Sequence, residues 1–140
     1  MKRIIVLLCI AIFSTQLGLS PPDKTLIIAG RPPLEPFKAL LEAVGMVESG
    51  NDPCAYNHGE MATGIYQIRP IRILDYNQRT GKDYKLSDCY DIQISKEIFL
   101  YYAHKKHFTD LENIAKDWNG SGEQTVVYWE KIKSILDNAQ

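Results

Sequence analysis

The chain has 140 residues, of which 45% are hydrophobic and 24% charged, and its formal net charge is −1. This composition is typical of one globular domain with a modest core, and the length argues against two domains. The sequence lacks a basic run with interleaved aromatic residues, so it offers no electrostatic basis for nucleic-acid binding.

Residues 1–20 have the layout of a secretory signal peptide. Lys2 and Arg3 precede an apolar run over 4–13, and the segment then becomes polar and small. An apolar run of ten is too short for an ordinary membrane anchor, although the lack of a clean cleavage site leaves a retained membrane tether as the alternative. We expect an exported, periplasmic or extracellular protein without stable membrane insertion. Removal of the signal would leave 14 basic and 17 acidic residues, a net charge of −3.

A proline-rich linker is expected over 21–35 and a folded domain over 36–140. In the domain, apolar residues at three- and four-residue spacing predict a first helix from Pro36 to Gly50. Further helices are expected from Pro70 to Gly81 and over 91–106.

The end of the chain should form two more helices. Capping-box spacing is found at Thr109 with Glu112 and at Ser121 with Gln124. Residues 60–68 show no helical period, and we expect an irregular or short β-like piece there. The fold class is therefore predicted as mainly α, a single small helical domain with one short irregular or β-like element.

Cys54 and Cys89 remain as an even pair after Cys9 leaves with the signal. In an exported protein such a pair predicts a disulfide, and two free buried thiols are the alternative. The bridge would close a loop of 34 residues, for which the chain-entropy model gives roughly 3–4 kcal/mol.

Glu48 is the most informative charged residue. It follows Val44 by four residues, which places its carboxyl group on the apolar stripe of the first helix. Burial there would raise the pKa and keep the group partly protonated near neutral pH, as a general acid requires. The alternative is a residue at the helix end that extends into water.

Four stretches give Glu48 a context: "ESGNDP" at 48–53, "GIYQI" at 64–68, "IAKDWNGSG" at 114–122 and "TVVYW" at 125–129. In order and spacing they resemble the motifs of the lytic transglycosylase (SLT domain) and goose-type lysozyme-like superfamily. The resemblance covers about residues 37–136. It implies an α+β lysozyme-like fold in which the β-like element forms one wall of a glycan-binding cleft.

The resemblance makes Glu48 the catalytic acid and assigns substrate-binding positions to seven other residues. These are Ser49, Gly64, Tyr66, Gln67, Trp118, Asn119 and Tyr128. Tyr128 is the expected partner of Glu48. The sequence departs from the family where Ile65-Tyr66 replaces Leu-Met and Trp118-Asn119-Gly120-Ser121 replaces Tyr-Asn-Ala-Gly. Tyr66 and Trp118 could provide flat faces for pyranose rings, although such residues are more often core.

The implied function is a lytic transglycosylase that binds peptidoglycan glycan strands and cuts the MurNAc-GlcNAc β-1,4 bond. Glu48 would act first as acid and then as base, and the products would be 1,6-anhydro-muropeptides. No cofactor is expected. Recruitment by a larger cell-wall machine is left open.

Three alternatives stay open. The first is a hydrolytic lysozyme on the same fold, which would need a second carboxylate from Asp52, Glu60 or Asp117, each more typical of a turn or cap. The others are a non-catalytic glycan-binding module and a small secreted interaction protein. A metal site is not expected, because lysines flank the i, i+3 pair of His104 and His107.

Overall fold

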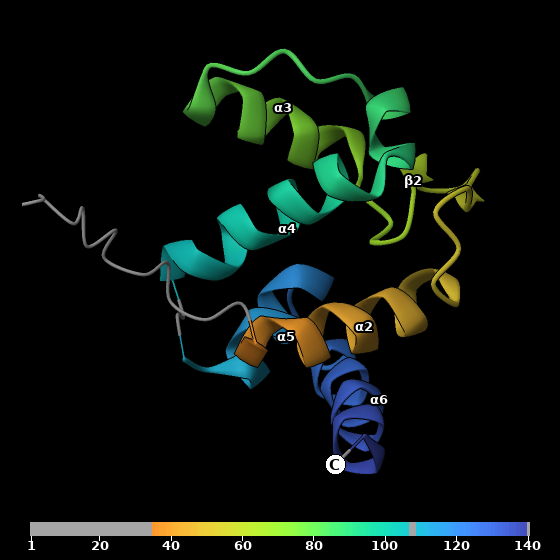
Figure 1. Ribbon diagram of the computed structural model, residues 1–140, viewed down its shortest axis with the longest axis vertical. Helices are drawn as coiled ribbons and strands as arrows, with labels where there is room; N and C mark the ends of the chain where they lie inside the picture. Colours follow the sequence, from red (N-terminus) through yellow and green to blue (C-terminus); the bar gives the residue numbers. More distant parts are fainter. Residues whose placement is uncertain (1–34, 107–108, 140) are drawn as a thin grey trace, which may run out of the picture. The chain divides into compact units, whose positions relative to one another are not determined.

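The computed structural model describes residues 35–106 and 109–139, and helices make up most of these residues (Figure 1). The predicted mainly α class is confirmed within these residues. The predicted signal peptide and nearly all of the linker lie outside them. The described elements, in chain order, are α2 (Glu35–Ser49), β1 (Tyr56–Asn57), β2 (Ala62–Thr63), α3 (Pro70–Thr80), the 3₁₀ helix η1 (Leu86–Tyr90), α4 (Ile92–Lys106), α5 (Leu111–Asn119) and α6 (Gln124–Asn138).

Helix α2 forms as the apolar spacing predicts. Phe37, Leu40 and Val44 are fully buried, since side chains three and four residues apart share one face. The helix ends at Ser49, and Gly50 follows with a φ of +67°. The predicted first helix is confirmed.

The segment without helical period contains a small hairpin. Strand β1 pairs antiparallel with β2, Tyr56 opposite Thr63, and Thr63 forms a further bridge with Ile68. Gly64 follows β2 with a φ of +77°, and a Cβ atom there would come within 2.0 Å of the Cys89 carbonyl oxygen. Only glycine therefore allows η1 to pack this closely against the turn. The expected β-like element is confirmed.

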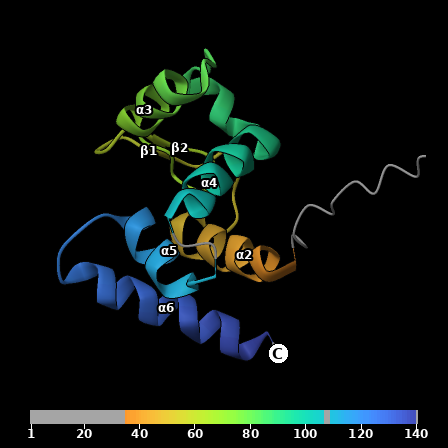
Figure 2. The same ribbon diagram turned by 90° about the vertical axis from the view of Figure 1, so that its left-hand side faces the viewer.

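The middle of the chain also matches the pattern. Proline begins α3, and Gly81 ends it in the left-handed conformation. Helix α4 starts after Asp91, whose Oδ1 accepts hydrogen bonds from the Gln93 and Ile94 backbone amides. Figure 2 shows α4 between α3 and α5.

The two capping boxes predicted near the end of the chain are wrong in detail, although both helices form. Asp110, one residue after Thr109, is the N-cap of α5, and its carboxylate accepts from the Asn113 amide at 3.0 Å. Ser121 lies before α6 and is not its N-cap, which is Glu123. The Gln124 side chain donates a hydrogen bond to the Ser121 carbonyl oxygen. Thr109 and Asp110 are both typical N-cap residues, and the backbone conformation before the helix decides which of them caps α5.

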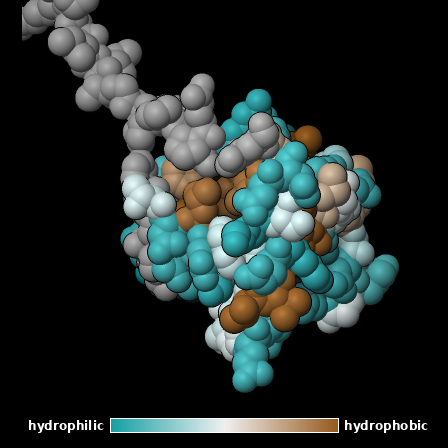
Figure 3. Space-filling model, turned by 90° about the horizontal axis from the view of Figure 1, so that it is seen from below, coloured by the Kyte–Doolittle hydropathy of each residue, from teal (hydrophilic) through white to brown (hydrophobic). Residues whose placement is uncertain are grey.

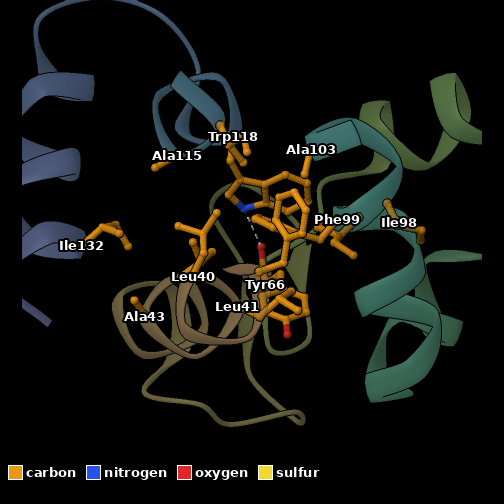
Figure 4. Packing of buried hydrophobic residues seen from close by; sticks show 14 of the residues in the cluster. Leu40, Leu41, Ala43, Tyr66, Ile98, Phe99, Ala103, Ala115, Trp118 and Ile132 are labelled. Atoms are coloured by element: carbon orange, nitrogen blue, oxygen red, sulfur yellow. Dashed lines mark hydrogen bonds between the residues drawn. The ribbon is translucent and has the colours of Figure 1, made fainter. Parts of the chain in front are cut away.

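The core lies where α2, α4, α5 and α6 meet (Figure 4). Phe99 of α4 packs against Trp118 of α5, with ring centroids 4.7 Å apart. Leu40 comes from α2 and Ile132 from α6. Large apolar residues from all four helices therefore hold one cluster together.

Not every apolar side chain is buried. Ile71, Leu74 and Val127 are more than half exposed. Figure 3 shows one face of the molecule, on which hydrophobic patches lie among hydrophilic side chains. Scattered exposed apolar residues are normal for a globular domain. None of the described helices has the length and apolar character that a membrane crossing requires.

The predicted disulfide is wrong for this structure, in which Cys54 and Cys89 are free thiols. Cys89 is wholly buried in η1, whereas Cys54 is exposed after α2. A disulfide needs the two Cβ atoms about 3.5–4.5 Å apart and directed at each other. One side chain enters the core and the other faces solvent, so the even count does not produce a bridge.

Candidate active site

Glu48 and Tyr128 form the centre of the candidate site. Glu48 is in the last turn of α2, and Tyr128 is on the buried face of α6. The Tyr128 hydroxyl donates a hydrogen bond of 2.8 Å to Glu48 Oε1. The packing of α6 on α2 thus brings together two side chains 80 residues apart, as the sequence resemblance predicted.

The pKa of the Glu48 carboxyl is raised above its ordinary value, chiefly because burial removes the charged form from water. The hydrogen bond from Tyr128 and the positive charges of Arg69 and Arg72 act in the opposite direction, and the negative charge of Glu60 adds to the increase. Burial is the largest effect. The expected raised pKa is therefore confirmed in direction.

Tyr128 is nine-tenths buried, and its own pKa is raised by burial and by the neighbouring Glu48. The phenol therefore stays protonated and serves as a donor. Within the described residues no hydrogen bond engages Glu48 Oε2. One carboxyl oxygen is held by Tyr128 and the other is free to exchange a proton with a ligand, which is the arrangement that a general acid needs.

Ser49 and Gln67 donate hydrogen bonds that hold the wall beside Glu48 together. Ser49 Oγ donates to the Ile65 carbonyl at 2.9 Å, which links the end of α2 to the turn after β2. Gln67 Nε2 donates to the Gly64 carbonyl at 2.9 Å. These bonds give Ser49 Oγ and Gln67 Nε2 a structural role, and the sugar-binding roles of Ser49, Gly64 and Gln67 stay predictions.

Tyr66 and Trp118 are core residues, and the expected sugar-stacking faces are not exposed. Tyr66 is 4% exposed and Trp118 6%. The Trp118 indole N–H donates to the Tyr66 carbonyl oxygen at 3.2 Å, as Figure 4 shows. Asn119, the last residue of α5, is partly exposed, and its side chain makes no hydrogen bond with any residue that the structure describes. Of these three predicted contacts, Asn119 is the one whose side chain is available to a ligand.

Arg72 was missed by the sequence reasoning. It lies on α3 and acts electrostatically on Glu48 and Tyr128. Its guanidinium lies over the Trp118 ring, 4.1 Å from the centroid, and donates to the Trp118 carbonyl oxygen at 3.0 Å. The available signal was an arginine next to Ile73 and four residues before Tyr76, the buried residues of α3.

Two of the other acidic candidates, Asp52 and Glu60, have local partners. Asp52 accepts from the Cys54 amide at 2.8 Å, as a turn residue does. Glu60 forms an ion pair with Arg69 at 2.9 Å, and both side chains are about half exposed. Asp117 is exposed on α5. Glu60 alone of these three acts on the pKa of Glu48.

Two cavities lie among the described residues, and neither Glu48 nor Tyr128 lines them. One of about 310 Å³ lies against α3, α4 and α5 and includes Arg72 and Trp118 in its wall. The other, of about 270 Å³, is lined by Tyr66 and by residues of α2 and α4.

The described part of the chain contains no group of three or more His, Cys, Asp or Glu residues able to hold a metal ion. His104 Nδ1 lies 2.7 Å from the Leu100 carbonyl oxygen, and His107 lies outside the described residues. Comparison with known proteins adds no assignment: no family model, no curated protein and no solved structure matches this chain.

Proposed function

We propose that this protein is a peptidoglycan-cleaving lytic transglycosylase with a lysozyme-like fold and that Glu48 is its general acid and base. The observation that carries the proposal is the Glu48–Tyr128 pair, a buried carboxyl group with a raised pKa, one oxygen held at 2.8 Å and the other free. Support also comes from the sequence, since the four motifs around this pair occur in the family order. The protein would be exported and would act on glycan strands.

In the proposed reaction, Glu48 Oε2–H protonates the glycosidic oxygen of the MurNAc-GlcNAc bond, and the bond to the muramic anomeric carbon breaks. The carboxylate then accepts the proton of the muramic 6-hydroxyl as that oxygen bonds to the anomeric carbon. No water is consumed, and Glu48 returns to its protonated form. The tethered hydroxyl has an advantage, because well-oriented intramolecular groups reach effective molarities of about 10⁵ M or more.

Hydrolysis is the second candidate, and one observation favours it. Glu60 lies within electrostatic range of Glu48 and carries a carboxylate that could orient water. Its ion pair with Arg69 opposes this role, since that 2.9 Å contact already engages the carboxylate and would have to open before Glu60 could orient water. We therefore place hydrolysis second.

Digestion of purified peptidoglycan tests the function. Glu48→Gln should lose activity by about 10²–10⁴-fold, because the amide keeps the hydrogen bond from Tyr128 but cannot donate a proton. Glu42→Gln is the matched control, since Glu42 lies on the same helix with its side chain exposed. It should cleave like wild type. Full activity of a folded Glu48→Gln protein would refute the proposal.

Mass spectrometry of the products separates the two reactions. Transglycosylation should release fragments that end in 1,6-anhydromuramic acid, lighter by one water than hydrolytic fragments and resistant to borohydride. Reducible muramic acid ends would instead establish hydrolysis. In that case Glu60→Gln should abolish the activity.

A further inference from the structure

The larger cavity, of about 310 Å³, has a wall made of two kinds of residue. Its buried members are apolar or aromatic, namely Phe99, Ala103, Ile114 and Trp118. Its charged members are Arg72, Asp75, Arg79, Lys105 and Asp117. Cations therefore outnumber carboxylates around an apolar surface. Ligand sites of proteins combine an apolar wall with a few polar groups in this way, and the volume is large enough for a small organic molecule.

Arg72 is held against this cavity with hydrogen-bond donors to spare. Its guanidinium lies 4.1 Å from the centroid of the Trp118 ring and 5.0 Å from that of Tyr102. Nη2 donates to the Trp118 carbonyl oxygen at 3.0 Å. The other N–H groups of the guanidinium make no hydrogen bond with any residue that the structure describes. Stacking engages the faces of the group, so its in-plane donors remain for a further acceptor.

The charge of Arg72 has no counter-ion among the residues described. Arg69 pairs with Glu60 and Arg79 with Asp75, whereas no described carboxylate lies within ion-pair distance of Arg72. Arg72 is also half-buried, and a charge withdrawn from water normally needs a partner. The two aromatic rings and the carbonyl oxygen offset part of that cost but carry no negative charge. An anion in the cavity would supply it.

The other charged groups of the wall favour an anion over a cation. Asp75 is already engaged, because Arg79 Nε donates to its Oδ1 at 2.7 Å and the Tyr102 hydroxyl lies 2.8 Å from its Oδ2. Lys105 adds a second positive charge and pairs with no carboxylate in the described part of the chain. Asp117 is exposed on α5, so water screens its charge. Among anions, a planar carboxylate matches the in-plane donors of a guanidinium and can accept two parallel hydrogen bonds.

We propose that this cavity is a binding site for a small carboxylate ligand. The carboxylate accepts hydrogen bonds from Arg72, and the apolar body of the ligand lies against the buried side chains of the wall. Lys105 supplies a second, weaker attraction from its exposed position. Carboxylates of this kind occur on the peptides of peptidoglycan fragments and on free organic acids. Glu48 does not line the cavity, so the site does not depend on the proposed function.

Titration of the full-length protein with N-acetyl-D-alanine tests the site. This probe carries one carboxylate, a short apolar body and no ammonium group. The chain has two tryptophans, and NMR of their indole N–H signals gives a reporter with an internal control. Trp118 lines the cavity, whereas Trp129 on α6 does not. The Trp118 signal should shift saturably while the Trp129 signal stays in place. N-acetyl-D-alanine amide, which has nearly the same shape without the charge, should give no saturable shift.

Three variants assign the binding to named side chains. Arg72→Gln should weaken the affinity for N-acetyl-D-alanine about 10- to 100-fold, since a hydrogen bond between charged groups is lost. Lys105→Gln should weaken it less than about fivefold, because Lys105 is exposed and its interaction is screened. The matched control is Arg69→Gln, the same substitution at an arginine outside the cavity wall. It should bind like wild type.

Three results would each overturn the proposal: no saturable Trp118 shift with the acid, equal affinity for acid and amide, or wild-type affinity in a folded Arg72→Gln protein. The comparison of acid with amide needs only the wild-type protein, so it decides the matter even if Arg72→Gln does not fold. Muramyl dipeptide, which carries a carboxylate on a peptidoglycan fragment, then distinguishes the sources. A Trp118 shift at lower concentration than with N-acetyl-D-alanine would assign the site to cell-wall peptides. A shift at equal or higher concentration would assign it to free organic acids.

Discussion

Replacement of Tyr128 by Phe should remove one hydrogen bond, the 2.8 Å bond to Glu48 Oε1, while the buried ring keeps its packing. A hydrogen bond to a charged group contributes about 1.5–3 kcal/mol and one to a neutral group about 0.5–1.5 kcal/mol. The bond should therefore stabilise the fold more when Glu48 is ionised. We expect the larger loss of unfolding free energy at pH 8 and the smaller one at pH 4.

The direction in which stability changes with pH follows from the raised pKa of Glu48. Burial raises the folded-state pKa above the unfolded value, so the contribution of Glu48 to stability is complete below the unfolded pKa and is lost as pH rises through the folded one. The Tyr128 hydroxyl limits that loss because it favours the carboxylate. Without the hydroxyl the folded pKa rises further, and stability decreases over a wider range of pH.

Urea denaturation followed by circular dichroism measures these differences in wild type, Tyr128→Phe, Glu48→Ala and the double variant. The double-mutant cycle should give a coupling energy of about 1.5–3 kcal/mol at pH 8 and a smaller one at pH 4. If Tyr128→Phe costs the same with and without the Glu48 carboxyl group, or the same at both pH values, the hydroxyl does not stabilise a carboxylate and the reasoning fails.

Three further predictions concern the fold around the site. Gly64→Ala should destabilise by about 3 kcal/mol or more in thermal unfolding, since a Cβ atom would overlap the Cys89 carbonyl; Gly81→Ala, with a φ of +72° but open space, should cost only about 1–2 kcal/mol. A thiol reagent should modify Cys54 in the native protein and Cys89 only after denaturation, because burial raises the Cys89 pKa to about 12; resistance of both thiols under denaturing, non-reducing conditions would mean a bridge. Asp110→Ala should remove the α5 cap and about 1 kcal/mol of stability in urea titration, and an unchanged midpoint would contradict that cap.

The helices were predictable because their signals are local. Apolar spacing identified α2, and the pattern at 91–106 identified α4. Proline at the first turn and glycine after the last gave the bounds of α3. The same spacing put Glu48 on the apolar stripe of α2 but left a solvent-exposed helix end as the alternative, so the raised pKa was a conditional prediction that the structure supports in direction.

The environment of each site side chain was decided by the tertiary structure. An aromatic residue has the same sequence signal in a core and in a sugar-binding wall, and packing placed Tyr66 and Trp118 in the core. Cys54 and Cys89 could pair only if their side chains pointed at each other, and an even number of cysteines gives no information on side-chain direction. The residues that bury Tyr66 and Trp118 and that separate the two thiols lie far apart in the chain, so no local sequence pattern indicated these results.

At the centre of the site, too, the sequence predicted some features and the tertiary structure decided the others. The sequence by itself placed Glu48 on the apolar stripe of a helix, and family resemblance supplied Tyr128 as its partner across 80 residues. Only the tertiary structure placed Arg72 against Tyr102 and Trp118, because α3, α4 and α5 must come together before the two rings can hold its guanidinium. Periodicity determines which face of a helix is buried, whereas the charges that meet a buried carboxyl group depend on which helices pack together.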